Sequence, residues 1–287
     1  MLWPGRWIVR WPVRCSLRWQ LSRSGIMATR RVANPALLLL LAAGCAGGPA
    51  AQADAEAWSA AVKKQDLTSL EQMLSANPDP DLAGGDGKTA LMIAAQAGDF
   101  DLTRDLIEAG ADVNARNQHL GTPLMFAATG GSVPVTRLLI DSGAQLNAVA
   151  RLGWTALLLA SAKGNTAAAL LLIAAGAEPN LADGYGWTPL MRALTGRHTD
   201  TVQGLLDSGL MDLEATEESG ATALHIAAGE GQADMVTLLL AAGADPALTD
   251  GAGRTPAAVA AMMGHEKIAA RLLAAENGLA TRRERPS

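Results

Sequence analysis

The sequence has few cysteines and few aromatic residues for its length. Its 287 residues include two cysteines and ten aromatic side chains, seven of which are tryptophan. The two cysteines, Cys15 and Cys45, lie 30 residues apart, which excludes a disulfide-rich scaffold and a zinc site made of cysteines. So few aromatic residues also argue against a large, irregular enzyme core. The interior must be filled by small and aliphatic side chains, chiefly the 58 alanines and 42 leucines.

An excess of basic residues is also absent. Lysine and arginine total 23 against 28 acidic residues, and this net charge of −5 argues against nucleic acid as the main partner. The charge is unevenly placed, because residues 1–53 hold seven arginines, no lysine and no acid. From Asp54 onward, 16 basic residues face 28 acidic ones, a net charge of −12. A basic N-terminal segment is therefore joined to an acidic remainder.

Residues 27–53 have the order of regions that is typical of a secretory signal. Basic residues after Met27 precede the apolar run Leu37–Ala43, and small residues follow it. The run is too short to cross a bilayer, which needs about 20 apolar residues, so no membrane span is predicted. Residues 1–26, which hold four tryptophans, are interpreted as a leader or as the result of a start codon assigned upstream of Met27.

Two processing sites are compatible with this signal. Cleavage after Ala51-Gln52-Ala53 would release a soluble periplasmic protein that begins at Asp54. Alternatively, Leu41–Cys45 resembles the lipobox of bacterial lipoproteins, in which an acylated Cys45 would anchor the protein to an envelope membrane. Because Ala42 stands where the lipobox has leucine, soluble export is the preferred interpretation.

The acidic remainder repeats with a period of 33 residues. A threonine recurs at spacings of 33, 33, 33, 34 and 33 residues. A glycine follows nine residues after five of these six threonines, and another follows 21 residues after five of them. Such a period indicates a solenoid, in which each unit buries its apolar face against its neighbours. The threonines are Thr89, Thr122, Thr155, Thr188, Thr222 and Thr255.

Each recurring residue has a physical role. The threonine precedes an apolar helical stretch, where its hydroxyl can accept a hydrogen bond from an unpaired backbone N–H, and proline after it suits the first turn. The glycine nine residues later can end that helix in the left-handed conformation. A second helix then runs to the next glycine. Each unit is therefore predicted to be a helix–turn–helix.

These units resemble the ankyrin repeat, whose signature is Thr-Pro-Leu-His-x-Ala. Thr122-Pro-Leu-Met-Phe-Ala and Thr222-Ala-Leu-His-Ile-Ala carry the start of this pattern, and Gly110-Ala-Asp-Val-Asn114 carries its end. The resemblance implies an all-α repeat solenoid of about seven repeats, joined by β-hairpin-like loops, over residues 54–278. Residues 279–287 are predicted to form a disordered tail.

Degenerate units are expected at both ends of the solenoid. Trp58 and Leu70 align one period before the first full unit, which predicts an N-terminal capping repeat without the threonine. A terminal cap is also expected where the last helix, Glu266 to Ala275, is not followed by Gly-Ala. Within the array, Arg197 replaces the helix-ending glycine and one extra residue lies near Gly209, so a local irregularity is predicted there.

Motifs for catalysis or cofactor binding are weak. Gly84–Thr89 resembles the end of a phosphate-binding loop, but the first glycine of that motif would fall at Leu82. Asp79 and Asp81 resemble part of a calcium loop whose other ligands are missing. The four histidines are dispersed, and His225 occupies the histidine slot of the repeat signature, where a capping role is expected. The sequence therefore predicts no enzyme, no cofactor and no metal site.

Ankyrin repeats bind proteins through their hairpin tips and the first helices of their concave face, so the resemblance points to candidate residues. Trp154 and Trp187 occupy the same tip position of consecutive repeats and are expected to lie side by side. They could brace neighbouring hairpins or form a binding hot spot, and both interpretations stay open. The candidate partner-binding residues are His119, Thr129, Arg151, Leu152, Trp154, Lys163, Tyr185, Trp187 and Thr195.

The preferred hypothesis is a non-enzymatic protein–protein interaction module exported to the bacterial envelope and monomeric on its own. The net charge of −12 favours a partner with a basic surface. Stabilising an envelope enzyme and neutralising a toxin as an immunity protein are both compatible with this class. The alternatives are a secreted effector that binds host proteins and, with little support, an enzyme or small-ligand binder that uses the groove.

Overall fold

The computed structural model describes residues 49–75 and 78–283. Contacts divide the chain into Met1–Gly47 and Gly48–Ser287, and the second unit holds every described residue. The predictions for the start at Met27, for most of the signal and for acylation of Cys45 fall outside the described residues. None of the described helices is long and apolar enough to span a membrane.

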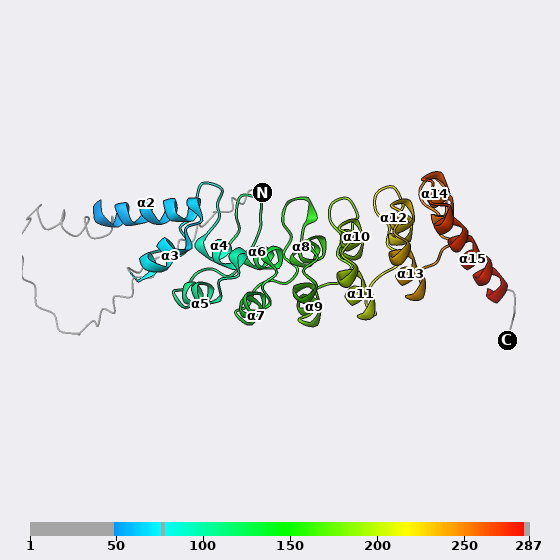
Figure 1. The fold of residues 1–287 in the computed structure, drawn as a ribbon. Coiled ribbons are helices and arrows are strands. Elements are labelled where there is room, and N and C mark those ends of the chain that lie inside the picture. Colours follow the sequence, from blue (N-terminus) through cyan, green and yellow to red (C-terminus); the bar gives the residue numbers. More distant parts are fainter. Residues whose placement is uncertain (1–48, 76–77, 284–287) are drawn as a thin grey trace, which may run out of the picture. The chain divides into compact units, whose positions relative to one another are not determined.

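The described residues form 14 α-helices arranged in seven pairs, as predicted (Figure 1). The first helices of the pairs contact one another from α4 to α14, and the second helices contact one another from α3 to α15. Two parallel layers of helices result. The pairs are α2 (Pro49–Lys64) and α3 (Leu67–Leu74), α4 (Ala90–Ala97) and α5 (Phe100–Glu108), α6 (Pro123–Gly130) and α7 (Val133–Asp141), α8 (Ala156–Lys163) and α9 (Thr166–Ala174), α10 (Pro189–Thr195) and α11 (Thr199–Asp207), α12 (Ala223–Gly229) and α13 (Ala233–Ala241), and α14 (Pro256–Met262) and α15 (Glu266–Arg283).

The recurring threonines start the first helices, as the sequence predicts. Each of the six stands at the N-cap, and the Thr155 hydroxyl, for example, accepts a hydrogen bond from the Leu158 N–H at 3.2 Å. At Thr222, His225 completes the cap: its Nδ1 accepts the Thr222 N–H at 3.2 Å. The other ring nitrogen of His225 lies 2.9 Å from the Arg254 carbonyl oxygen in the next repeat. The predicted capping role of His225 is confirmed.

The helix-ending slot keeps its backbone conformation even without glycine. Gly98, Gly131 and Gly164 have φ of 74°, 79° and 72°, and Arg197 in the same slot has φ of 57°. An arginine in this left-handed region costs on the order of 1–2 kcal/mol. The repeat register therefore overrides the local preference of Arg197.

The extra residue of the fifth repeat produces the predicted irregularity. In four of the other repeats, an alanine after the second glycine is buried and closes the helix end; the Ala177 N–H, for example, donates to the Leu172 carbonyl at 2.9 Å. Leu210 stands at this place in the fifth repeat, is 53% exposed, and donates its N–H to the Ser208 hydroxyl instead. The insertion is thus absorbed in the loop between α11 and α12.

Alanine and leucine form the interior, as the composition requires. Alanines such as Ala94, Ala127 and Ala160 of the first helices are fully buried, and so are leucines of the second helices such as Leu106 and Leu139. Trp58 is the exception in size: it is fully buried in the N-terminal pair, where it joins the same core cluster. This aromatic residue closes the end of the stack that the degenerate repeat caps.

The C-terminal helix extends further than the sequence predicts. Residues 279–287 are predicted to be disordered, but α15 continues to Arg283, so this prediction is wrong for residues 279–283. No proline occurs between Glu266 and Arg285, and Gly278 within a helix costs only about 1 kcal/mol relative to alanine. Residues 284–287 lie outside the described part of the chain.

Replacement of Trp58 tests its role as the anchor of the N-terminal cap. We expect Trp58→Ala to lower the free energy of unfolding by about 3–5 kcal/mol, because a fully buried ring leaves a cavity. Trp58→Phe is expected to cost only about 1 kcal/mol, since the ring nitrogen it removes has no hydrogen-bond partner among the described residues. Urea unfolding of both variants measures this, and equal losses would contradict the assignment.

Candidate protein-binding site

The tips between repeats are tight hairpin turns that are joined to one another. In the tip before α8, the Ala150 N–H donates to the Trp154 carbonyl at 2.8 Å, and in the next tip the Asp183 N–H donates to the Trp187 carbonyl at 3.0 Å. Backbone bonds also run from tip to tip; the Gly184 N–H, for example, donates to the Leu152 carbonyl at 2.7 Å. The predicted β-hairpin-like loops are therefore present, and the hydrogen bonds between them fix the position of each tip relative to the next.

Trp154 and Trp187 flank a shared arginine. The Arg192 guanidinium carbon lies 4.7 Å from the centroid of the Trp154 ring and 5.0 Å from that of the Trp187 ring. Its nitrogens also pair with the Asp183 carboxylate, whose side chain is fully buried. The other carboxylate oxygen of Asp183 accepts the N–H groups of Tyr185 and Trp187 at 2.9 and 3.1 Å. Because one guanidinium contacts the rings of both tryptophans, the arrangement favours the interpretation that Trp154 and Trp187 brace the two hairpins.

The sequence interpretation did not select Arg192 or Asp183, although a signal for Arg192 exists. Four residues after each recurring threonine the sequence has an apolar side chain in five units and arginine in one. A charged residue in an otherwise apolar slot requires a partner, and the paired tryptophans and the acid at the tip supply it. The six residues of this slot are Ile93, Phe126, Leu159, Arg192, Ile226 and Val259.

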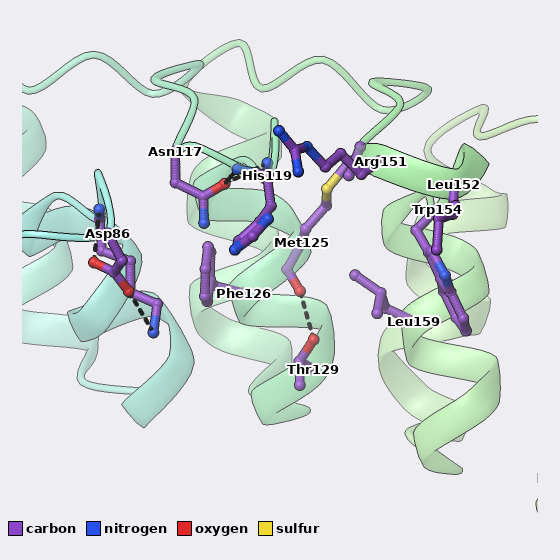
Figure 2. Close-up of a pocket in the computed structure, with 13 residues that line it drawn as sticks. Asp86, Asn117, His119, Met125, Phe126, Thr129, Arg151, Leu152, Trp154 and Leu159 are labelled. Carbon is purple, nitrogen blue, oxygen red and sulfur yellow. Dashed lines mark hydrogen bonds and ion pairs between the residues drawn. The ribbon is translucent and has the colours of Figure 1, made fainter.

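Next to this cluster, the tips before α6 and α8 and the first helices below them enclose a groove of about 790 Å³. Figure 2 shows His119 and Arg151 at its upper edge, with Met125, Phe126 and Leu159 below them. Trp154 forms the wall toward the next repeat, and Leu152 stands on the same tip. We call this groove the tip groove; it is also lined by Asp86, Lys88, Asn117, Gly121, Thr129 and Ala150.

The basic side chains that line the tip groove differ in whether they form an ion pair with an acidic side chain. On the N-terminal side of the groove, the Lys88 ammonium lies 3.2 Å from the Asp86 carboxylate and 5.6 Å from the centroid of the Phe126 ring. The charge of Lys88 and a hydrogen bond from its backbone N–H lower the pKa of Asp86 against the raising effect of burial. Arg151 is exposed and forms no ion pair within the described residues.

Two leucines beside the groove are exposed on a strained backbone. Leu120 and Leu152 have φ of 62° and 59°, and their side chains are 44% and 61% exposed. A left-handed conformation costs a non-glycine residue on the order of 1–2 kcal/mol, and an exposed leucine regains little of this by packing. Backbone strain of this kind is over-represented at binding sites, which makes the two leucines candidates for a contact with a partner.

The structure places five of the nine sequence-predicted candidates around the groove: His119, Thr129, Arg151, Leu152 and Trp154. Trp187 and the exposed Tyr185 belong to the next tip. The Thr129 and Thr195 hydroxyls donate to carbonyls of their own helices, at 2.9 Å to Met125 and 3.0 Å to Arg192. Lys163 is exposed at the end of α8 and does not line the groove.

The motifs that hinted at cofactors have structural roles. Lys88 of the apparent phosphate loop pairs with Asp86, and Thr89 caps α4. The Asp81 carboxylate accepts the Asp112 N–H at 3.0 and 3.2 Å, which links two neighbouring loops. Burial is the main cause that raises the pKa of Asp81. Within the described residues, no group of three or more histidine, cysteine or acidic side chains could hold a metal ion.

The paired, stacked helices and the hydrogen-bonded hairpin tips define a helical-repeat solenoid. A family model described as ankyrin repeats in three copies matches residues 58–150, 101–183, 148–216 and 210–283. The chain therefore belongs to the ankyrin repeat family, whose members are generally protein–protein interaction modules and typically non-catalytic.

A solved structure has the same fold. The crystal structure of the human ASB11 ankyrin repeat domain is similar to this chain with a TM-score of 0.66 and 23% sequence identity. The match covers 75% of this chain and 96% of that chain. At this identity the likeness supports the solenoid fold alone.

Removing Arg192 distinguishes a brace from a partner contact. We expect Arg192→Met to lower the free energy of unfolding by about 3 kcal/mol, because the buried Asp183 carboxylate loses its counter-charge. Arg104→Met is the matched control: Arg104 forms exposed ion pairs with Asp101 and Asp105, and its loss should cost less than about 1 kcal/mol. Thermal and urea unfolding measure both, and a similar small loss in each variant would refute the brace.

Proposed function

We propose that this chain is a non-enzymatic binding protein, exported to the bacterial envelope, that holds a protein partner on the tip groove and the tips beside it. The observation that carries the proposal is the pairing of an open apolar groove with two exposed leucines on a strained backbone. The exposed side chains of these two leucines add little to the packing between helices that holds the repeats together.

The tips suit this role because they vary without disturbing the stack. Hydrogen bonds between neighbouring tips hold Leu152 and the adjacent side chains in place before a partner arrives. Such preorganisation lowers the entropy lost on binding. An exposed apolar side chain at the edge of a groove can enter a pocket on a partner, and the groove can accept a side chain in return.

Export is supported by the sequence alone. A basic start, a short apolar run and small residues precede the repeats, and the run is too short to remain as a membrane span. In the envelope, a protein of this kind would stabilise an enzyme or neutralise a toxic one. Soluble release before Asp54 and acylation of Cys45 both place the repeats in that compartment.

Affinity capture from cells tests the proposal. The full chain with a C-terminal tag is expressed in a bacterium, and the periplasmic and membrane fractions are separated before capture and mass spectrometry. We expect one protein to be captured by the wild-type chain and lost with Leu120→Ser plus Leu152→Ser, because two hot-spot contacts contribute on the order of 2 kcal/mol each.

The control is Leu273→Ser, which removes a leucine of similar exposure, 50%, from α15. The control variant should retain the partner, and all variants should unfold within about 0.5 kcal/mol of the wild type, as is usual for surface changes. Equal capture by both variants, or recovery of the chain from the cytosol alone, would argue against the proposal.

A further inference from the structure

We propose that the tip groove binds an acidic peptide segment of the partner, with one apolar side chain of that segment seated on the groove floor. This inference rests on the proposed function and adds the chemistry of the partner. It is carried by three observations: an apolar floor, a basic rim, and a buried amide whose donor faces the groove.

The floor of the groove can receive an apolar side chain. Phe126 and Leu159 occupy the same slot of consecutive repeats and are only partly buried, so apolar surface remains open beside them. Met125 lies between them with its sulfur toward Arg151, and the Trp154 ring bounds this surface beyond Leu159 (Figure 2). Burial of a leucine-sized or phenylalanine-sized side chain on such a surface contributes about 1.5–3 kcal/mol.

The rim of the groove is basic. Lys88, His119 and Arg151 line it, and among the described lining residues Asp86 is the one acid. Asp86 is already paired with Lys88, whereas Arg151 forms no ion pair within the described residues. The guanidinium of Arg151 can therefore bind a carboxylate of a partner without first breaking a contact.

Asn117 adds a neutral donor to the same rim. Asn117 is 7% exposed, and its side-chain oxygen accepts the N–H groups of His119 and Gly121 at 2.9 and 2.8 Å. These two bonds fix the amide orientation, so that its NH₂ group is directed toward the floor of the groove (Figure 2). This NH₂ group donates no hydrogen bond within the described residues. The NH₂ group can therefore donate to a carboxylate or a peptide carbonyl of a bound segment.

The local charge matters more here than the net charge of −12. Exposed charges are screened over about 8 Å at physiological ionic strength, and the acids Asp101 and Asp105 on α5 are already paired with Arg104 at 2.9 Å. The net charge favours a basic partner at long range, whereas the groove itself selects an acidic segment. An anionic membrane would also satisfy the basic rim, but a recessed apolar floor fits a side chain rather than a flat surface.

Selection from a random peptide library displayed on phage tests this chemistry. The full chain is immobilised, and peptides that it enriches are compared with those enriched by Arg151→Glu and by the control Arg137→Glu. Arg137 is an exposed arginine on α7, outside the groove. We expect the wild type and the control to enrich segments in which acidic residues surround a leucine or an aromatic residue, and Arg151→Glu to bind them at least about tenfold more weakly.

The outcomes separate this inference from the proposed function. Enrichment of basic or uncharged peptides, no enrichment, or equal binding by Arg151→Glu would overturn the inference, even if the double variant Leu120→Ser plus Leu152→Ser still loses the partner. Binding to phosphatidylglycerol vesicles that depends on Arg151, without peptide enrichment, would overturn it in favour of a membrane surface. Binding of the enriched peptides that is also lost in Phe126→Ala, with the helical circular dichroism unchanged, supports it.

Discussion

The structure depends on the close stacking of helix pairs, because no single pair can bury its own apolar surface. A pair of short helices exposes most of its apolar surface, so each repeat gains stability only from the repeats on either side. Fully buried alanines such as Ala94, Ala127 and Ala160 allow the first helices to approach closely. The recurring threonines and glycines keep the helix pairs in register, which is why even Arg197 adopts the left-handed conformation of its slot.

Because stacking fixes the helices, the tips are free to differ from one repeat to the next. The tips before α8 and α10 use this freedom in two ways. Trp154, Trp187 and Asp183 hold Arg192 and join two hairpins. A related carboxylate, Asp250, pairs with Arg254 in a later tip, and this partner lowers the pKa of Asp250 to about 2. The side chains of other tip residues, such as Leu152, are exposed.

The sequence predicted the repeat architecture because each recurring residue has a local role: a threonine hydroxyl at an N-cap, a glycine at a left-handed position, an alanine where helices meet. It also placed Trp154 and Trp187 on adjacent tips. Arg192 was missed because its role depends on residues from two other loops, so that spacing within one repeat does not reveal it. The amide of Asn117 was missed for the same reason, since its direction follows from the fold of the tip.

The central claim is that a partner contacts the tips and the groove rather than the outer helices. A photo-crosslinking amino acid placed at position 152, or at position 137 on α7, in the full chain in living cells tests it most directly. Irradiation should join the chain with the probe at position 152 to one envelope protein, and should give no such product with the probe at position 137. A product formed at position 137 but not at position 152 would contradict the account.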